Sequence, residues 1–229
     1  MTLHEAIVHT LKSTNKPMTT QQIAASIPKT TTKPVVQSEP VPQVEMEFKD
    51  LEKVLMNVAN FKSASIIDLS VPEKPGLYCI RIKNIDALPK PFSTELNNRH
   101  HNIIYIGIAT QSLNRRMLNQ ELRANGHGTF FRSLGAVLGF RPPLNSLAVK
   151  KNKRNYKFSS ADETKIINWI NDNLLINWEE QRNGFEEIET VLILKYKPLI
   201  NLAKNPYAME DLSKLRKECV AVANGRKVE

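Results

Sequence analysis

Five residues of the sequence have side chains that together could cleave a phosphodiester bond. They are Tyr78, Tyr105, Arg116, Glu189 and Asn201. A carboxylate can hold a divalent cation that acts as a Lewis acid, and an arginine fork can neutralise charge on a transferring phosphoryl group. A phenol can pass or accept a proton if a metal and an arginine lower its pKa. These residue types therefore suit phosphodiester hydrolysis if folding brings them together.

Each of these residues also has a purely structural explanation. A tyrosine in a strand is more often a packed aromatic than a base, and helical arginines usually form a solvated face. Glu186, Glu187 and Glu189 lie at the start of an expected helix, where acids favour the helix dipole. Asn201 follows Pro198 and could be a turn or cap residue. Only the order and spacing of the whole set favour the catalytic interpretation.

The elements that must position these side chains can be read from hydrophobic periodicity. The pattern predicts strands at 65–69, 77–82 and 102–107, and helices at 113–125, 160–174, 185–196 and 209–222. Helices and strands are mixed along the chain, so the fold class is α/β (α+β). Because the strands are close together in sequence, we expect a small antiparallel or mixed sheet with packed helices.

The first 45 residues differ in composition from the remainder. Residues 1–28 predict two short helices, and residues 29–45, rich in Thr, Pro, Val and Gln without Gly, predict a semi-rigid linker. Residues 46–229 are dense in apolar side chains and are expected to form the globular domain. The opening segment contains Leu3-His4-Glu5-Ala6-Ile7 and then Lys16-Pro17-Met18-Thr19-Thr20-Gln21-Gln22-Ile23-Ala24. With these residues it resembles the start of a HARE-type winged-helix module that lacks its third helix and wing.

The ordered set of chemical residues resembles the GIY-YIG endonuclease superfamily over roughly residues 74–202. The resemblance is carried by Gly76-Leu77-Tyr78, Tyr105-Ile106-Gly107, Leu113-Asn114-Arg115-Arg116 and the block from Glu189 to Asn201. The last block is similar to that of the bacterial excision-repair incision subunit, with the same separation between Glu and Asn. Each motif is short, whereas the ordered set is specific.

The resemblance implies a fold and a set of roles. The fold is a small central three-stranded antiparallel sheet flanked by helices, and the cofactor is a single Mg2+ or Mn2+ ion held by Glu189. One of Tyr78 and Tyr105 is expected to activate water, and Asn201 to orient the surroundings of Glu189.

The arginine assignment has two candidates, because the Leu-x-x-Arg match selects Arg116 whereas counting from Gly107 without a gap selects Arg115. The chain also departs from the family pattern. Ile108 stands where many relatives carry Lys, and Gln120, which cannot titrate, stands where relatives often have His or Tyr. His127 could supply the missing acid or base, and the equally weighted alternative is a turn histidine.

A basic stretch around residues 149–157 is a candidate DNA-binding loop. Its residues are Lys150, Lys151, Lys153, Arg154 and Tyr156, with the tyrosine expected to stack on a base. The alternative is a solubilising loop. Arg115 is a further candidate for contact with a phosphate.

Composition limits the classes of function. The 229 residues carry a formal net charge of +9, which favours a polyanionic partner. Residues 81–157 hold 14 Lys and Arg against three Asp and Glu, whereas the remainder is slightly acidic. No run of 18 apolar residues predicts a spanning helix. Without a recognisable signal peptide, and with Cys79 and Cys219 unable to form a disulfide framework, we expect a cytoplasmic protein.

The sequence therefore predicts a metal-dependent DNA endonuclease. The alternative is a catalytically inactive DNA-binding module that retains the fold. A homodimer would allow a double-strand cut, because each chain offers one site.

Overall fold

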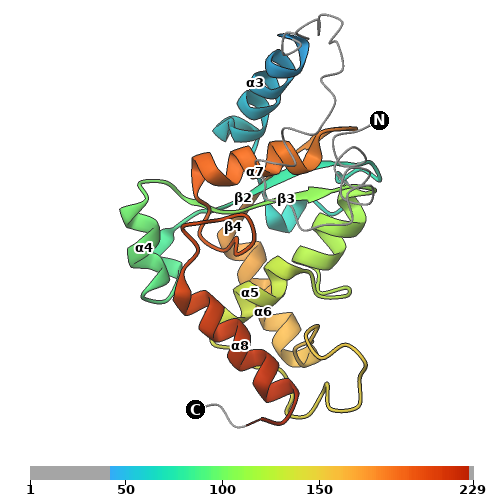
Figure 1. The fold of residues 1–229 in the computed structure, drawn as a ribbon, viewed down its shortest axis with the longest axis vertical. Coiled ribbons are helices and arrows are strands. Elements are labelled where there is room, and N and C mark those ends of the chain that lie inside the picture. Colours follow the sequence, from blue (N-terminus) through green and yellow to red (C-terminus); the bar gives the residue numbers. More distant parts are fainter. Residues whose placement is uncertain (1–41, 227–229) are drawn as a thin grey trace, which may run out of the picture. The chain divides into compact units, whose positions relative to one another are not determined.

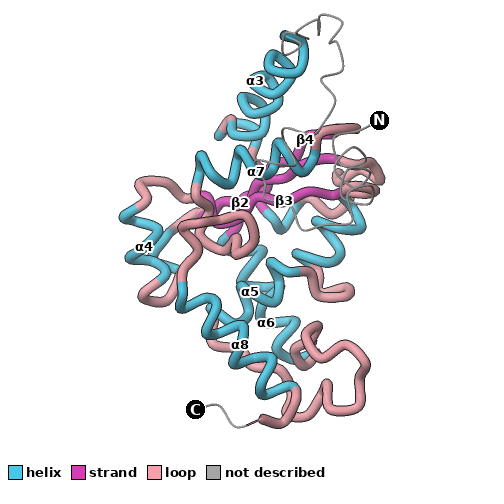
Figure 2. Tube along the Cα trace, viewed as in Figure 1, coloured by secondary structure: helices cyan, strands magenta, loops and turns pink. Residues whose placement is uncertain are grey.

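The computed structural model describes residues 42–226. Helices and strands alternate along this part of the chain (Figures 1 and 2). In order they are α3 (Pro42–Met56), η1 (Val58–Asn60), β1 (Lys62–Ser63), η2 (Ala64–Ile66), β2 (Gly76–Ile82), η3 (Ile85–Ala87), α4 (Phe92–Asn98), β3 (Ile103–Ala109), the π-helix η4 (Asn114–Leu122), α5 (Thr129–Val137), α6 (Ser160–Asn173), β4 (Leu174–Glu180), α7 (Phe185–Tyr196) and α8 (Glu210–Ala223).

The strands form one antiparallel sheet in the order β1-β4-β2-β3. The predicted mixed fold with a small antiparallel sheet is thereby confirmed. Three strands of seven residues make up most of the sheet, and the two-residue strand β1 adds a fourth at the edge of β4. The sheet therefore has four strands instead of the expected three, and the additional strand is the short β1.

The third long strand is not where the sequence pattern places it. Residues 65–69 were expected to be extended, but they form the end of the 3-10 helix η2 and a turn, with Ile66 and Leu69 exposed. The strand is β4, which follows α6 directly at Leu174. No glycine or proline separates the helix from the strand, and the polar residues at the boundary, Asn171, Asp172 and Asn173, were assigned to the predicted helix 160–174.

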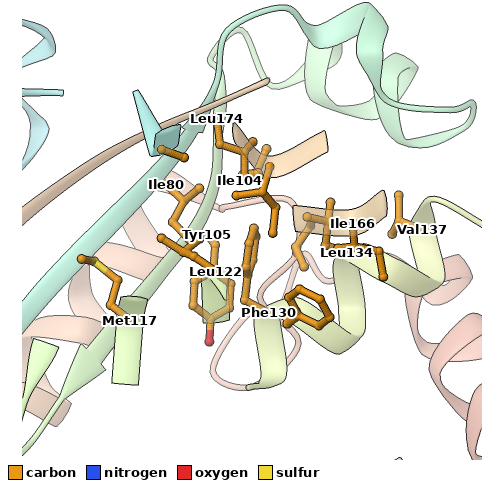
Figure 3. Packing of buried hydrophobic residues seen from close by; sticks show 14 of the residues in the cluster. Ile80, Ile104, Tyr105, Met117, Leu122, Phe130, Leu134, Val137, Ile166 and Leu174 are labelled. Carbon is orange, nitrogen blue, oxygen red and sulfur yellow. The ribbon is translucent and has the colours of Figure 1, made fainter. Parts of the chain in front are cut away.

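Helices cover both faces of the sheet. In Figure 1, α7 and the end of α3 lie on one side of the strands, and α5, α6 and α8 lie on the other. Side chains of β2 alternate between these sides: Leu77 and Cys79 join the smaller core cluster, whereas Tyr78 and Ile80 join the larger one. Figure 3 shows part of the larger cluster, in which Tyr105 lies close to Phe130.

A bulge in β3 sets the direction of its side chains. Ile80 pairs with Tyr105, but Arg81 pairs with Ile103, so Ile104 is an extra residue in β3. Such a bulge bends a strand and changes which face its side chains reach. Tyr105 lies on the Ile80 face, which is also the face of Tyr78.

The predicted domain boundaries fall at the start of the described residues. One compact unit spans Glu45–Glu229, and α3 begins at Pro42, inside the segment predicted to be linker. The predicted helices of residues 1–28 and residues 29–41 of the linker lie outside the described residues, so the domain division stays a prediction. None of the helices of residues 42–226 is both long and apolar enough to cross a membrane.

Candidate active site

A polar cavity of about 370 Å³ opens where β2, β3, η4 and α7 meet. It brings together most of the residues singled out from the sequence. Its lining includes Tyr78, Tyr105, Arg115, Arg116 and Glu189, together with Ile108 and Gln120. Asn201 and His127 are absent from the lining.

The two tyrosines lie side by side because of the strand register. Tyr78 stands opposite Gly107, and Tyr105 stands opposite Ile80 on the same face. Their ring centroids are 6.1 Å apart. A Cβ on Gly107 would lie 2.6 Å from both Cζ and the hydroxyl oxygen of Tyr78, so only glycine leaves room for this ring.

The first-motif glycine also has a packing role rather than only a turn role. A Cβ on Gly76 would overlap the carbonyl oxygen of Glu179 in β4 and lie 2.8 Å from Leu113. Gly76 thus lets β4 approach β2 closely at the mouth of the cavity, a known use of glycine within a strand.

Both phenols are held in the protonated form. Burial raises the pKa of Tyr78 well above its ordinary value, and the neighbouring Tyr105 and Glu121 act in the same direction. Burial likewise raises the pKa of Tyr105, with Glu121 adding to the effect and Arg116 opposing it. The Tyr78 hydroxyl is buried and makes no hydrogen bond of good geometry within the described residues, while the Tyr78 side chain forms part of the cavity lining.

Glu189 is the carboxylate of α7 that faces the cavity. Its side chain is 14% exposed, and its Oε2 lies 2.9 Å from Nζ of Lys204. Glu186 and Glu187 are exposed and do not line the cavity. This difference supports Glu189 among the three acids. The hydrogen bond to Glu189 raises the pKa of Lys204. No motif of the sequence singles out this lysine, which follows Asn201 by three positions.

The donor set suits a magnesium ion better than a zinc ion. No group of three His, Cys, Asp or Glu side chains with metal-binding geometry occurs within residues 42–226. Structural and catalytic zinc sites need three or four such ligands. Mg2+ is often bound through one or two carboxylates, with water and substrate phosphates completing its shell. A single carboxylate beside the unpartnered Tyr78 hydroxyl fits that second pattern.

Arg116 is the arginine that the structure holds in place. Its Nη2 lies 2.8 Å from Oε1 of Glu121, and its Nη1 donates to Oε1 of Gln120 at 3.1 Å. About a third of its side chain remains exposed, at 34%. Arg115 also lines the cavity but points to solvent. Arg116 therefore suits the arginine place of the motif, and Arg115 remains a candidate phosphate contact.

Asn201 supports the site from behind β3. Its Oδ1 accepts from the Ile106 amide at 3.0 Å, and its Nδ2 donates to the Ile106 carbonyl at 2.8 Å. The side chain is buried, with both ends of its amide used by the strand. The polar atoms of Asn201 are thus occupied away from the cavity. This placement agrees with the orienting role expected for Asn201 rather than with direct contact to the reacting atoms.

His127 does not replace Gln120 at the cavity. It is buried between Phe131 and Phe158, and its Nε2 lies 3.2 Å from Oε1 of Glu163. Burial lowers its pKa to about 4, with the charges of Lys157 and Arg132 adding to the effect. The catalytic interpretation is wrong for this conformation. The turn interpretation fits better, because His127 has a positive φ of 52°.

The basic loop is exposed, but its tyrosine is not. Lys150, Lys151, Lys153 and Arg154 are exposed between α5 and α6, in a loop that lies beside the end of α8 (Figure 2). Tyr156 is fully buried, and its hydroxyl donates to the Arg132 carbonyl. The predicted base stacking by Tyr156 is therefore wrong, because its ring is part of the core.

The sequence was compared with models of known protein families, with curated proteins and with solved structures. The model of the GIY-YIG catalytic domain matches residues 76–218, a span that contains all the cavity residues named above. No curated protein and no solved structure matches the chain. The match covers more than half of the sequence and agrees with the order of the motifs. The chain therefore belongs to the GIY-YIG nuclease family.

Proposed function

We propose that this protein is a divalent-metal-dependent endonuclease that hydrolyses phosphodiester bonds of DNA. The observation that carries the proposal is the convergence of Tyr78, Tyr105, Arg116 and Glu189 on one polar cavity. These side chains come from four different elements, so their meeting has no explanation in local structure alone.

Each side chain has a role that its surroundings support. Glu189 would hold Mg2+ or Mn2+, and such an ion supplies Lewis-acid stabilisation of charge on the phosphoryl group. Arg116 keeps an exposed part of its fork toward the cavity and donates to phosphate oxygens. Tyr78 and the neighbouring Tyr105, whose side chains line the cavity, orient the attacking water and exchange its proton.

The raised pKa values of the two phenols bear on this proton transfer. Without added positive charge, both remain protonated at neutral pH and can only donate. Arg116 already acts to lower both pKa values. A divalent cation held by Glu189 would add positive charge to that of Arg116 and lower the phenol pKa values further. A tyrosine would therefore act as a base only when the metal is bound.

Cleavage of supercoiled plasmid tests the proposal. Wild-type protein with Mg2+ or Mn2+ is expected to nick or linearise the plasmid, and chelation by EDTA should stop the reaction. Glu189→Ala should lose at least about 100-fold in rate, the scale expected when a principal electrostatic group is removed. Glu186→Ala, on the exposed face of the same helix, is the matched control. Equal rates for wild type and Glu189→Ala would reject the site assignment.

A catalytically inactive DNA-binding module is the second candidate. It is favoured by Ile108 in the place of a cation and by the ion pair that occupies Glu189. Salt-dependent DNA binding with no metal-dependent cleavage would support this alternative. A homodimer and a cytoplasmic location stay predictions, and sedimentation of the protein with and without DNA would test the first.

A further inference from the structure

A buried carboxylate lies behind the candidate site and has no role in the function proposed above. Glu121 has no exposed side-chain surface, at 0%. Its Oε2 accepts from the backbone amides of Phe130 and Phe131 at 2.8 and 3.3 Å, where α5 begins. Its Oε1 faces Nη2 of Arg116 at 2.8 Å. The carboxylate therefore joins the start of α5 to the arginine of the cavity.

The π-helix makes this pairing possible. Arg116 and Glu121 are five residues apart, and an α-helix would place them about 140° apart around its axis. A π-helix closes hydrogen bonds from i to i+5 and brings such residues onto one side. The same spacing recurs two residues earlier, where Nδ2 of Asn119 donates to the carbonyl and side-chain oxygens of Asn114. The unusual helix type thus sets the Arg116–Glu121 contact.

The surroundings of Glu121 leave its carboxylate little freedom. A Cβ on Gly128 would overlap both carboxylate oxygens, although the backbone of Gly128 has an ordinary negative φ of −64°. Space rather than backbone conformation therefore requires glycine at this position. Burial raises the pKa of Glu121, whereas Arg116 and the two backbone amides oppose that effect. A buried ion pair adds little stability compared with packed apolar side chains, so stability alone gives no reason for it.

We propose that Glu121 is a positioning residue, which holds the guanidinium of Arg116 in the orientation needed for phosphate contact. Arg116 has five N–H donors in a rigid fork. Gln120 accepts a hydrogen bond from Nη1. Oε1 of Glu121 lies 2.8 Å from Nη2 as an ion pair without hydrogen-bond geometry, and the exposed remainder of the fork faces the cavity. The inference rests on the proposed nuclease function, because the contact to be positioned is with a phosphate.

Steady-state kinetics of Glu121→Gln test this role. The amide keeps the size of the side chain but removes the charge that pairs with Arg116. We expect kcat for plasmid cleavage to fall about 10- to 100-fold, with KM for DNA changed less than about threefold. Glu95→Gln is the matched control, because Glu95 pairs with Arg99 on α4 at the same 2.8 Å distance but away from the cavity.

A double-mutant cycle separates positioning from a general structural role. If Glu121 acts through Arg116, the double variant Arg116→Ala, Glu121→Gln should be no slower than Arg116→Ala alone. The proposal would be overturned if the rate losses of the two single variants multiplied in the double variant, or if Glu121→Gln raised KM without lowering kcat. If Glu121→Gln fails to fold, a measurement on the wild-type protein tests the same role.

An NMR measurement distinguishes failure of this inference from failure of the proposed function. The Nε–Hε group of Arg116 in the wild-type protein should be rigid, with an order parameter above about 0.8, whereas that of exposed Arg115 should be below about 0.6. Equal mobility of the two would overturn the positioning role even if the protein cleaves DNA. A rigid Arg116 in a protein that cleaves nothing would overturn only the nuclease function.

Discussion

At the scale of single residues, the site depends on a glycine that leaves room for a phenol. Gly107→Ala is expected to displace the Tyr78 ring, because the new methyl group would lie within 2.6 Å of it. Overpacking of this kind costs about 1–3 kcal/mol of unfolding free energy. Urea unfolding and plasmid cleavage would both report the change. In a Tyr78→Ala background the same substitution should cost less, since the contact with Cε1 of Tyr105 at 2.8 Å then remains alone; an unchanged cost would contradict this explanation.

Lys204 is expected to compete with the metal for Glu189. Lys204→Met removes the cation that lies 2.9 Å from the carboxylate. We expect Mn2+ affinity, measured by titration calorimetry, to rise roughly three- to tenfold, as if about 1 kcal/mol of competing ion-pair energy were removed. Lys195→Met is the control, because Lys195 pairs with Glu52 outside the cavity. Weaker Mn2+ binding in Lys204→Met would show that the lysine supports the site instead.

His127 is expected to make stability depend on acid pH. Its pKa is lowered from 6.5 to about 4 in the folded protein. Below pH 6.5 the unfolded chain therefore binds a proton that the folded chain does not, and stability falls as the pH drops toward 4. Since each pH unit is worth about 1.4 kcal/mol, the loss is on the order of 2–3 kcal/mol.

The variant His127→Asn isolates this contribution, because asparagine does not titrate and tolerates a positive φ. Urea unfolding between pH 4 and 7 should show a shallower loss of stability than in the wild type. His100→Asn is the control at an exposed histidine that also has a positive φ, of 56°. If both variants flatten the profile equally, the burial of His127 is not the cause.

At the scale of elements, the segment after α7 closes the edge of the sheet. Ile200 donates to the carbonyl of Ile104, and the Asn201 amide pairs with Ile106. This segment shields the outer edge of β3, which otherwise presents unpaired backbone groups. It also links the helix that carries Glu189 to the strand that carries Tyr105. The separation of Glu and Asn in the sequence therefore reflects one helix plus the chain that returns to β3.

Asn201→Ala tests this edge contact. The variant leaves the Ile106 amide and carbonyl without their side-chain partner, so we expect a loss of about 1–3 kcal/mol. Hydrogen exchange of the Ile106 amide should become faster by a matching factor. Asn205→Ala is the control, because its buried amide bonds to the carbonyls of Pro198 and Asn201 rather than to β3. Unchanged exchange at Ile106 in Asn201→Ala would contradict the assigned contact.

The elements also show where sequence patterns succeed. Strands β2 and β3 were predicted because short apolar or alternating segments such as Leu77–Ile82 are typical of strands. Helix α7 was predicted from its apolar residues, with Pro198 marking its end. The helix around Arg116 was predicted, but its π form was not, since an apolar pattern cannot distinguish helix types over nine residues. Strand β4 was missed because no glycine or proline marks the end of α6, and Asn171-Asp172-Asn173 was assigned to the helix.

At the scale of the whole molecule, much of the positive charge is used internally. Six arginines of the basic segment 81–157 bond within the protein: Arg81, Arg99, Arg116, Arg123, Arg132 and Arg141. Only part of the local excess of charge is therefore available to a polyanion. The exposed remainder lies at Arg115 beside the cavity, in the loop after α5, and at Lys83 and Lys90 before α4.

The loop is expected to contribute to DNA affinity but not to the chemical step. Lys150→Ala combined with Lys151→Ala should weaken binding and reduce the slope of log K against log salt by up to about 1.8, if both contact phosphates. The kcat should stay unchanged, because neither residue lines the cavity. Neutralising exposed Lys53 and Lys165 provides a charge-matched control. An equal effect in the control would mean that net charge alone drives binding.

The sequence by itself determined the chemical groups, their order and the family. Those features depend on residue identity and spacing, which the chain carries directly. Tertiary structure alone decided which groups meet: Glu121 with Arg116, Lys204 with Glu189, and Tyr156 with the core instead of solvent. The physical reason is that charge pairing, burial and available space depend on neighbours that are distant in sequence or on a helix type that periodicity does not reveal.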